Sequence, residues 1–109
     1  MKRLLLTATA VLLSSAAGFA ADGKAVFDAN GCAACHDAKK EMVGPPLSEI
    51  AAKYAGKKAK ADLAKFLEGK AKPKVDPKEF AVMKPNLQKT EALSKEDRAA
   101  LADFILGHK

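Results

Sequence analysis

The feature that most constrains this chain is how few large apolar side chains it has beyond its N-terminal segment. Residues 21–109 include 20 Val, Ile, Leu, Met, Phe and Tyr side chains among 89 residues, beside 18 alanines. A domain of this size buries only about 60–70% of its unfolded surface, and small domains commonly need disulfides, a metal or a cofactor. Two cysteines exclude a scaffold of several disulfides. We therefore expect one domain that folds around something other than its own side chains.

The N-terminal segment has the pattern of a secretory signal peptide. Lys2 and Arg3 precede an uncharged stretch over residues 4–21, first rich in leucine and then in small residues. We expect residues 1–20 to be removed by cleavage after Ala20 and the mature chain to lie in the periplasm. A retained membrane anchor is the alternative, but the serine, threonine, glycine and alanine content disfavours stable membrane insertion.

The charge pattern excludes one class of partner and favours another. Beyond residue 20 the chain has 17 basic and 13 acidic residues, and Arg98 is the only arginine there. Nucleic-acid binders cluster basic residues on one face and interleave aromatic side chains. Here acidic residues are interspersed and aromatics make up only 6% of the chain, so no nucleic-acid partner is expected. A lysine-rich surface instead favours steering towards an acidic partner.

Cap residues mark the first and the last of four expected helices. Asp22 can cap a short helix over residues 23–30, and Gly31 follows it as a residue that tolerates a left-handed conformation. Ser94 can cap the last helix, with Asp97 at the capping-box position. The apolar face of this last helix consists of Leu101, Phe104 and Ile105.

Two further helices are indicated by apolar side chains at helical spacing, each followed by a glycine: Leu47, Ile50 and Tyr54 before Gly56, and Leu63, Phe66 and Leu67 before Gly69. No segment alternates as a strand does, so the predicted fold is all-α. Between Gly69 and Ser94, three prolines exclude a single regular helix, and we expect a long loop. Its apolar residues indicate that this loop packs against something.

The chemistry resides in the motif Cys32-Ala33-Ala34-Cys35-His36, which has the C-x-x-C-H spacing of covalent haem attachment. Cysteines three residues apart lie on one turn of chain, so both sulfurs can add to the vinyl groups along one haem edge. His36 follows directly and can place its imidazole under the iron. The haem would then be the central hydrophobic body that the thin core lacks.

Two alternatives use the same cysteines. A thioredoxin-type redox pair also reads C-x-x-C, but it belongs at the end of a strand in an α/β fold, and no strand is predicted. Structural zinc requires four ligands, and beyond the motif the chain offers only His108, which we expect to be a solvated tail residue.

An iron bound by His36 has one axial position left, for which methionine is the candidate. Met42 lies six residues after His36, too near to round the haem, and is expected in the core or the pocket wall. Met83 lies 47 residues after His36, in the long loop that could close over the other haem face. Met83 is therefore the expected ligand, with an ordinary core position as the alternative.

Five short motifs follow one another along the chain: Gly31-Cys32-Ala33-Ala34-Cys35-His36, Met42-Val43-Gly44-Pro45, Ala51-Ala52-Lys53-Tyr54-Ala55-Gly56, Met83-Lys84-Pro85-Asn86 and Leu101-Ala102-Asp103-Phe104. Together they resemble the small bacterial class I c-type cytochromes, the short periplasmic monohaem "five-fifty-one" and "five-fifty-two" type. The resemblance covers residues 21–109. It implies a class I cytochrome c fold, with about four helices wrapped around one covalently bound haem c.

The resemblance also implies roles for individual residues. Cys32 and Cys35 would form the thioether bonds, while His36 and Met83 would be the axial ligands of the iron. The backbone carbonyl of Pro45 would accept the proton on His36 Nδ1, which fixes the ring and tunes its basicity.

Two more contacts and two departures follow from the same comparison. Asn86 would help to hold the methionine loop, and Phe27 and Phe104 would meet where the first and last helices cross. Lys84 stands where the family often has proline, and the chain has no tryptophan to bind a haem propionate. Tyr54 and basic loop residues are the candidates to replace it.

The implied function is that of a soluble periplasmic electron carrier, cycling between Fe(II) and Fe(III), and not an enzyme. The expected partners are larger periplasmic or membrane-bound redox enzymes that dock through an acidic surface, and the carrier is expected to be a monomer. The lysines expected near the haem edge are Lys39, Lys40, Lys70, Lys72, Lys74, Lys78, Lys84 and Lys89. The alternatives are a haem c protein that binds NO or CO through a labile sixth ligand, and a domain equivalent to the haem subunit of a larger enzyme.

Overall fold

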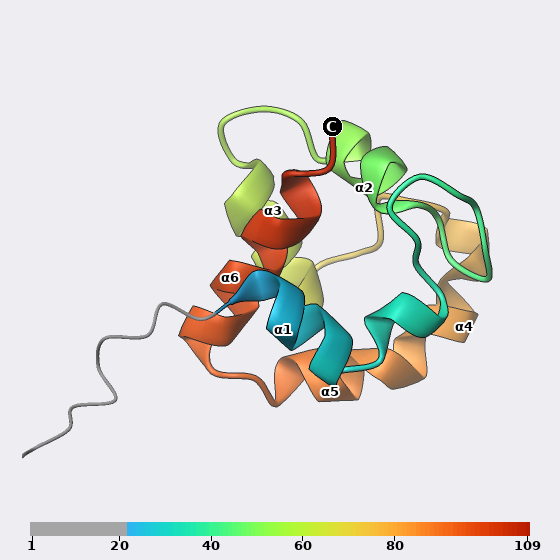
Figure 1. The fold of residues 1–109 in the computed structure, drawn as a ribbon. Helices are drawn as coiled ribbons and strands as arrows, with labels where there is room; N and C mark the ends of the chain where they lie inside the picture. The colour runs from blue at the N-terminus through green and yellow to red at the C-terminus, as the bar shows by residue number, and fades with distance from the viewer. Residues whose placement is uncertain (1–21) are drawn as a thin grey trace, which may run out of the picture.

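The computed structural model describes residues 22–109, so the predicted signal peptide and its cleavage site lie outside the described residues. No strand occurs in this part of the chain, which confirms the all-α prediction. Its α-helices are α1 (Gly23–Ala29), α2 (Leu47–Lys53), α3 (Ala59–Leu67), α4 (Phe80–Met83), α5 (Leu87–Glu91) and α6 (Lys95–Leu106) (Figure 1). Short 3₁₀ segments are η2 (Cys32–Ala34), η3 (Pro77–Glu79) and η4 (Lys84–Asn86). None of these helices is long and apolar enough to cross a membrane.

The predicted caps are present at both ends of the domain. The Asp22 carboxylate accepts a hydrogen bond of 3.0 Å from the Lys24 N–H at the start of α1. Gly31, after the end of α1, has a φ of 71°, the left-handed conformation that favours glycine. The Ser94 hydroxyl accepts a hydrogen bond of 3.1 Å from the Asp97 N–H at the start of α6. Local sequence therefore determines where these two helices begin.

Helices α1 and α6 cross closely, although they are distant in sequence (Figure 1). The rings of Phe27 and Phe104 lie 5.3 Å apart between centroids at the crossing, which confirms their predicted contact. A Cβ atom at Gly23 would collide with the Ala100 carbonyl oxygen and the Phe104 Cβ. Glycine at this position thus allows the two helix backbones to approach each other.

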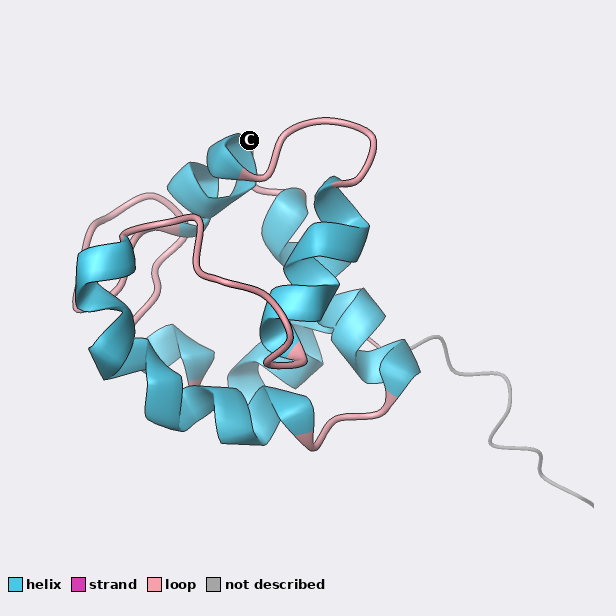
Figure 2. Ribbon diagram, turned by 180° about the vertical axis from the view of Figure 1, so that it is seen from behind, coloured by secondary structure: helices cyan, strands magenta, loops and turns pink. Residues whose placement is uncertain are grey.

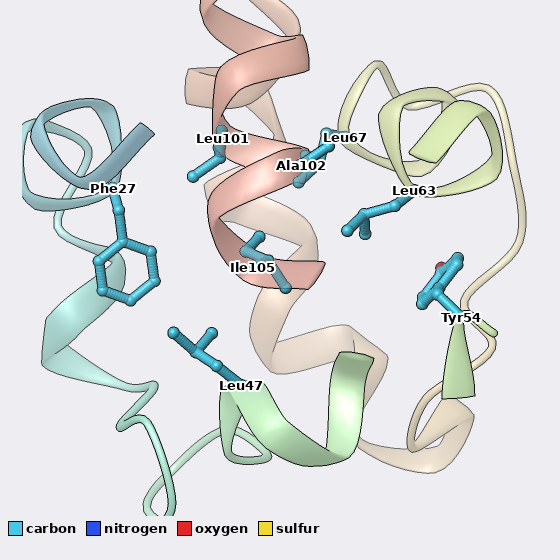
Figure 3. Close-up of a cluster of buried hydrophobic side chains, with 8 residues drawn as sticks. All are labelled: Phe27, Leu47, Tyr54, Leu63, Leu67, Leu101, Ala102 and Ile105. Atoms are coloured by element: carbon cyan, nitrogen blue, oxygen red, sulfur yellow. The ribbon is translucent and has the colours of Figure 1, made fainter. Parts of the chain in front are cut away.

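The hydrophobic core lies between α6 and the helices around it. Its buried side chains point towards one another from four helices and the residue after α2: Phe27, Leu47, Tyr54, Leu63, Leu67, Leu101, Ala102 and Ile105 (Figure 3). Leu101 and Ala102 of α6 are completely buried. This cluster is small, as the sequence predicts, and it borders a large cavity.

The stretch between Gly69 and Ser94 differs from the prediction of a long loop. Its first part is irregular and runs across the molecule before η3, and residues 92–93 at its end are irregular as well (Figure 2). The rest forms η3, α4, η4 and α5 in succession. Pro77 and Pro85 lie in the first turns of η3 and η4, where a missing N–H costs no helical hydrogen bond. Prolines exclude one regular helix here but permit several short ones.

Candidate haem site

A deep cavity, partly open to solvent, lies between the helices. A concave site that is mostly apolar and holds a few polar groups is typical of cofactor binding. Most of its lining side chains are apolar or aromatic, and they include Leu47, Ile50, Leu63, Phe66, Leu101 and Ile105. The motif residues Cys32, Cys35 and His36 line the same cavity. An interior this apolar provides a dry surrounding for a large planar hydrophobic group.

The cysteine motif is held on one tight turn. The left-handed Gly31 leads into η2, and the Cys32 carbonyl accepts hydrogen bonds from the N–H groups of Cys35 (3.2 Å) and His36 (2.9 Å). The two cysteines are not joined by a disulfide. Burial raises the pKa of the Cys32 thiol. A redox-active C-x-x-C pair depends on a lowered thiol pKa, so this environment does not favour the thioredoxin-type alternative.

The orientation of the His36 ring follows from one hydrogen bond. His36 Nδ1 lies 2.7 Å from the Pro45 carbonyl oxygen. A carbonyl oxygen can only accept, so Nδ1 carries the proton and Nε2 keeps its lone pair. This is the tautomer that a histidine needs to bind a metal through Nε2.

Gly44 supports the His36 ring from one side, a role for which the sequence offers no signal beyond the glycine itself. A Cβ atom at this position would lie 2.7 Å from His36 Nδ1 and 2.9 Å from Nε2, closer than van der Waals contact allows. The Gly44 N–H also donates a hydrogen bond of 2.8 Å to the Cys35 carbonyl. The Gly44 backbone therefore packs directly on the imidazole and ties its own loop to the motif.

Replacing Gly44 with alanine is expected to lower the free energy of unfolding by about 1–3 kcal/mol, the usual cost of overpacking a filled site. The methyl group must displace the His36 ring, because it would meet three of the ring's atoms. Gly107→Ala is the matched control, since a Cβ there would meet only backbone oxygens at 3.4 Å. Thermal unfolding of both variants checks this. Equal melting temperatures for the two would contradict the expectation.

Met83 and Met42 occupy different environments. Met83 is the last residue of α4, is half-buried and lines the cavity. Asn86, three residues further on in η4, lines the same cavity. Met42 is 48% exposed, so the prediction that it lies in the core or the pocket wall is wrong. The reason is a turn in which the Met42 N–H donates to the Gly44 carbonyl, which places Met42 at the outer tip.

Comparison with known proteins now identifies the family. A family model for cytochrome c matches residues 20–109. The chain belongs to the cytochrome c family. It is 35% identical over 112 residues to cytochrome c-551 of Stutzerimonas stutzeri, with 100% of both chains covered. It is 36% identical over 109 residues to cytochrome c-552 of Hydrogenobacter thermophilus, again with 100% of both covered. With cytochrome c-552 of Nitrosomonas europaea it shares 40% over 91 residues, which cover 83% of this chain and 82% of that one.

This cytochrome is thus of the small class I c-type, whose members carry one covalently bound haem c and transfer electrons. The cavity fits such a group on three counts. It is large and apolar, two unbridged cysteines line it, and His36 can offer Nε2 as a metal ligand. The thin core of the sequence is explained in the same way, because much of the interior is the cavity.

Tyr54 and Lys74 meet at the cavity of this cytochrome. Tyr54 is 4% exposed, and the Lys74 ammonium lies 5.2 Å from the centroid of its ring. Lys74 Nζ also forms an ion pair of 3.2 Å with Asp62. Burial raises the pKa of the Tyr54 phenol, so the group remains a neutral hydrogen-bond donor. One aromatic hydroxyl and one cation therefore lie at the cavity. They are the candidates to bind a haem propionate in place of the missing tryptophan.

The second histidine of this cytochrome lies outside the cavity. His108 Nδ1 is 2.7 Å from the Phe104 carbonyl oxygen, and its ring packs edge-on against the Phe104 ring at 4.7 Å. The prediction of a solvated tail residue is therefore wrong, because His108 extends the aromatic contact between α1 and α6. Within residues 22–109, no three His, Cys, Asp or Glu side chains are grouped to hold a metal ion.

Proposed function

We propose that this cytochrome is a periplasmic electron carrier in which His36 and Met83 are the axial ligands of the haem iron. Cys32 and Cys35 form the two thioether bonds, and Asn86 supports the segment that carries Met83. The observation that carries the proposal is the hydrogen bond of 2.7 Å from His36 Nδ1 to the Pro45 carbonyl oxygen. It prepares Nε2 for a metal beside a cavity that Met83 also lines.

Each of these side chains has a separate task. The bound haem supplies an iron that gains and loses one electron. Pro45 and Gly44 hold the His36 imidazole in one orientation. The Met83 thioether favours the ferrous state and so raises the reduction potential. With both axial positions occupied by side chains, no position remains for a substrate, and we propose that the protein is not an enzyme.

Optical spectra of the purified holoprotein in both oxidation states test this assignment. The reduced spectrum should be that of a haem c with two side-chain ligands. The oxidised spectrum should show the near-infrared charge-transfer band from sulfur to iron. A reduced parent protein that takes up CO readily would instead indicate a labile sixth ligand and contradict the proposal.

The mature protein is proposed to comprise residues 21–109, released into the periplasm by cleavage after Ala20, and to act as a monomer. The first residue of the mature chain is then Ala21, and the first residue of α1 is Gly23. Only two residues precede the helix that packs on α6.

We further propose that redox partners dock at the mouth of the cavity. Val43 and Val82 both line the cavity and are 63% and 52% exposed, and Met42 is exposed beside Val43. The eight lysines named above around the motif and between residues 70 and 89 are all exposed. Asp76 and Glu79 also line the cavity, so the positive charge around the mouth is not continuous. Of these lysines only Lys74 lines the cavity, and the others are exposed on the segments that border it in sequence. An apolar centre flanked by exposed lysines suits larger redox enzymes with an acidic docking surface.

Reversing the charge of Lys84 is expected to slow electron transfer to an anionic redox partner at low salt. Lys84 follows Val82 and Met83 directly and is exposed, so Lys84→Glu alters the field at the proposed docking surface. Lys109→Glu is the matched control, because this exposed lysine is in the C-terminal tail. The difference should fade as the Debye length shortens from about 30 Å at 0.01 M to about 8 Å at 0.15 M salt.

Stopped-flow rates against ionic strength, with one anionic and one cationic partner, measure this difference. Identical salt dependence for the two partners would leave the lysines only a solubilising role. Equal effects of the two substitutions would contradict the placement of the docking surface.

A further inference from the structure

Arg98 binds the end of the helix that follows the Met83 segment. Its guanidinium, on the second turn of α6, donates to three backbone carbonyls: Thr90 (3.1 Å), Glu91 (2.9 Å) and Leu93 (2.8 Å). Carbonyls at a helix C-terminus have no partner within the helix. A planar, permanently charged group with several donors can satisfy the Thr90 and Glu91 carbonyls at the end of α5 and the Leu93 carbonyl just beyond it. One side chain therefore joins the beginning of α6 to the end of α5.

Thr90 continues this connection from α5 to α3. Its side chain is 2% exposed, and Oγ1 lies 2.6 Å from the Leu67 carbonyl and 3.1 Å from the Leu87 carbonyl. A hydroxyl has one proton, so the shorter contact is the principal hydrogen bond. Leu67 is the last residue of α3, and both Leu67 and Thr90 line the cavity. The hydroxyl thus anchors α5 at the cavity wall.

The anchored helix α5 is continuous with the segment that carries Met83, which lines the cavity. Residues 80–91, which we call the distal segment, run without interruption through α4, η4 and α5. At its beginning, the Phe80 ring packs against Phe66 of α3, 5.9 Å away between centroids. At its end, Thr90 is hydrogen-bonded to α3, and Arg98 of α6 is hydrogen-bonded to the carbonyls of Thr90 and Glu91. Met83 lies between these two attachments, so its distance from the cavity depends on both.

We propose that Arg98 and Thr90 are positioning residues that hold the distal segment closed and so control how readily the Met83 sulfur leaves the iron. This proposal rests on the axial role proposed for Met83. Opening of the segment exposes the sixth coordination position, and the population of the open state rises when an anchor is removed. Both residues act on the iron through Met83; Thr90 lines the cavity, whereas Arg98 does not.

The test measures CO binding to the ferrous holoprotein and the pH at which the ferric protein loses its charge-transfer band from sulfur to iron. Arg98→Ala and Thr90→Val should each bind CO at least roughly tenfold faster, because losing a charge-assisted or buried hydrogen bond changes an equilibrium by about that factor. Both should lose the band at a lower pH than the parent. Arg98→Lys should have a CO-binding rate between those of the parent and Arg98→Ala, since lysine keeps the charge but cannot reach three carbonyls together.

Two controls separate positioning from general stability. Lys60→Ala removes an exposed ion pair of 2.7 Å to Asp103, which lies on α6 as Arg98 does. This variant should bind CO at the rate of the parent and lose the band at the same pH. Phe104→Leu weakens the crossing of α1 and α6 and should lower the melting temperature without faster CO binding. If Arg98→Ala and Thr90→Val bind CO no faster than Phe104→Leu, the positioning role is refuted. A parent protein without the band would refute the Met83 ligation first, which distinguishes the two failures.

Discussion

Met83→Ala is expected to remove the sixth ligand of the iron, lower the reduction potential and allow CO to bind. In the proposed assignment the Met83 thioether is the ligand that favours the ferrous state, so its loss lowers the potential. The truncated side chain also leaves part of the cavity wall open, because Met83 lines it. Potentiometry, CO titration and the near-infrared spectrum of the oxidised protein measure the three effects.

Met42→Ala is the matched control for this substitution. Met42 is the same residue type, but it is 48% exposed at the tip of its turn. The Met42→Ala protein should therefore retain the reduction potential, the charge-transfer band and the resistance to CO of the parent. An unchanged band in oxidised Met83→Ala, or its loss in Met42→Ala, would contradict the assignment of the sixth ligand.

A chain in which Cys32 and Cys35 are both alanine, prepared without haem, is expected not to fold cooperatively. Its core would be the small cluster around α6, beside an apolar cavity with nothing to fill it. Ordering a chain costs about 1.5 kcal/mol per residue, which must be offset by buried apolar surface. The helical circular dichroism signal should be weak and should change gradually on heating.

The parent holoprotein provides the comparison for this experiment. Acid-acetone extraction should leave its haem on the chain, as covalent attachment requires, and its helical signal should be lost in one transition. A haem-free double variant with full helicity and a cooperative transition would show that the haem is not needed for folding.

The parts of the fold that depend on neighbouring residues could be predicted from the sequence. Asp22 and Ser94 cap their helices through contacts two or three residues away. Gly31, Gly56 and Gly69 were each predicted to follow the end of a helix, and all three have a positive φ. These features need no knowledge of the tertiary structure, because the interacting groups are only a few residues apart.

The parts that depend on distant contacts were harder to predict. The sequence shows no long apolar period for α4 and α5, because these helices have only four and five residues. They are held by distant contacts instead: Phe80 of α4 packs on α3, and Arg98 binds the end of α5. The exposure of Met42 depends on a turn whose hydrogen bonds join Cys35 to Gly44. The contact of Gly44 with His36 arises from the same turn, so the motif alone could not reveal it.

The close crossing of α1 and α6 also determines the order in which the molecule can be completed. α1 begins at Gly23 and finds its main packing partner only in residues 95–106. As the chain is synthesised, α1 therefore lacks its main packing partner until nearly the whole chain has emerged. The thiols of Cys32 and Cys35 follow this helix directly and stay accessible for the same interval. The cavity that these two residues line thus stays open until α6 emerges and completes the domain.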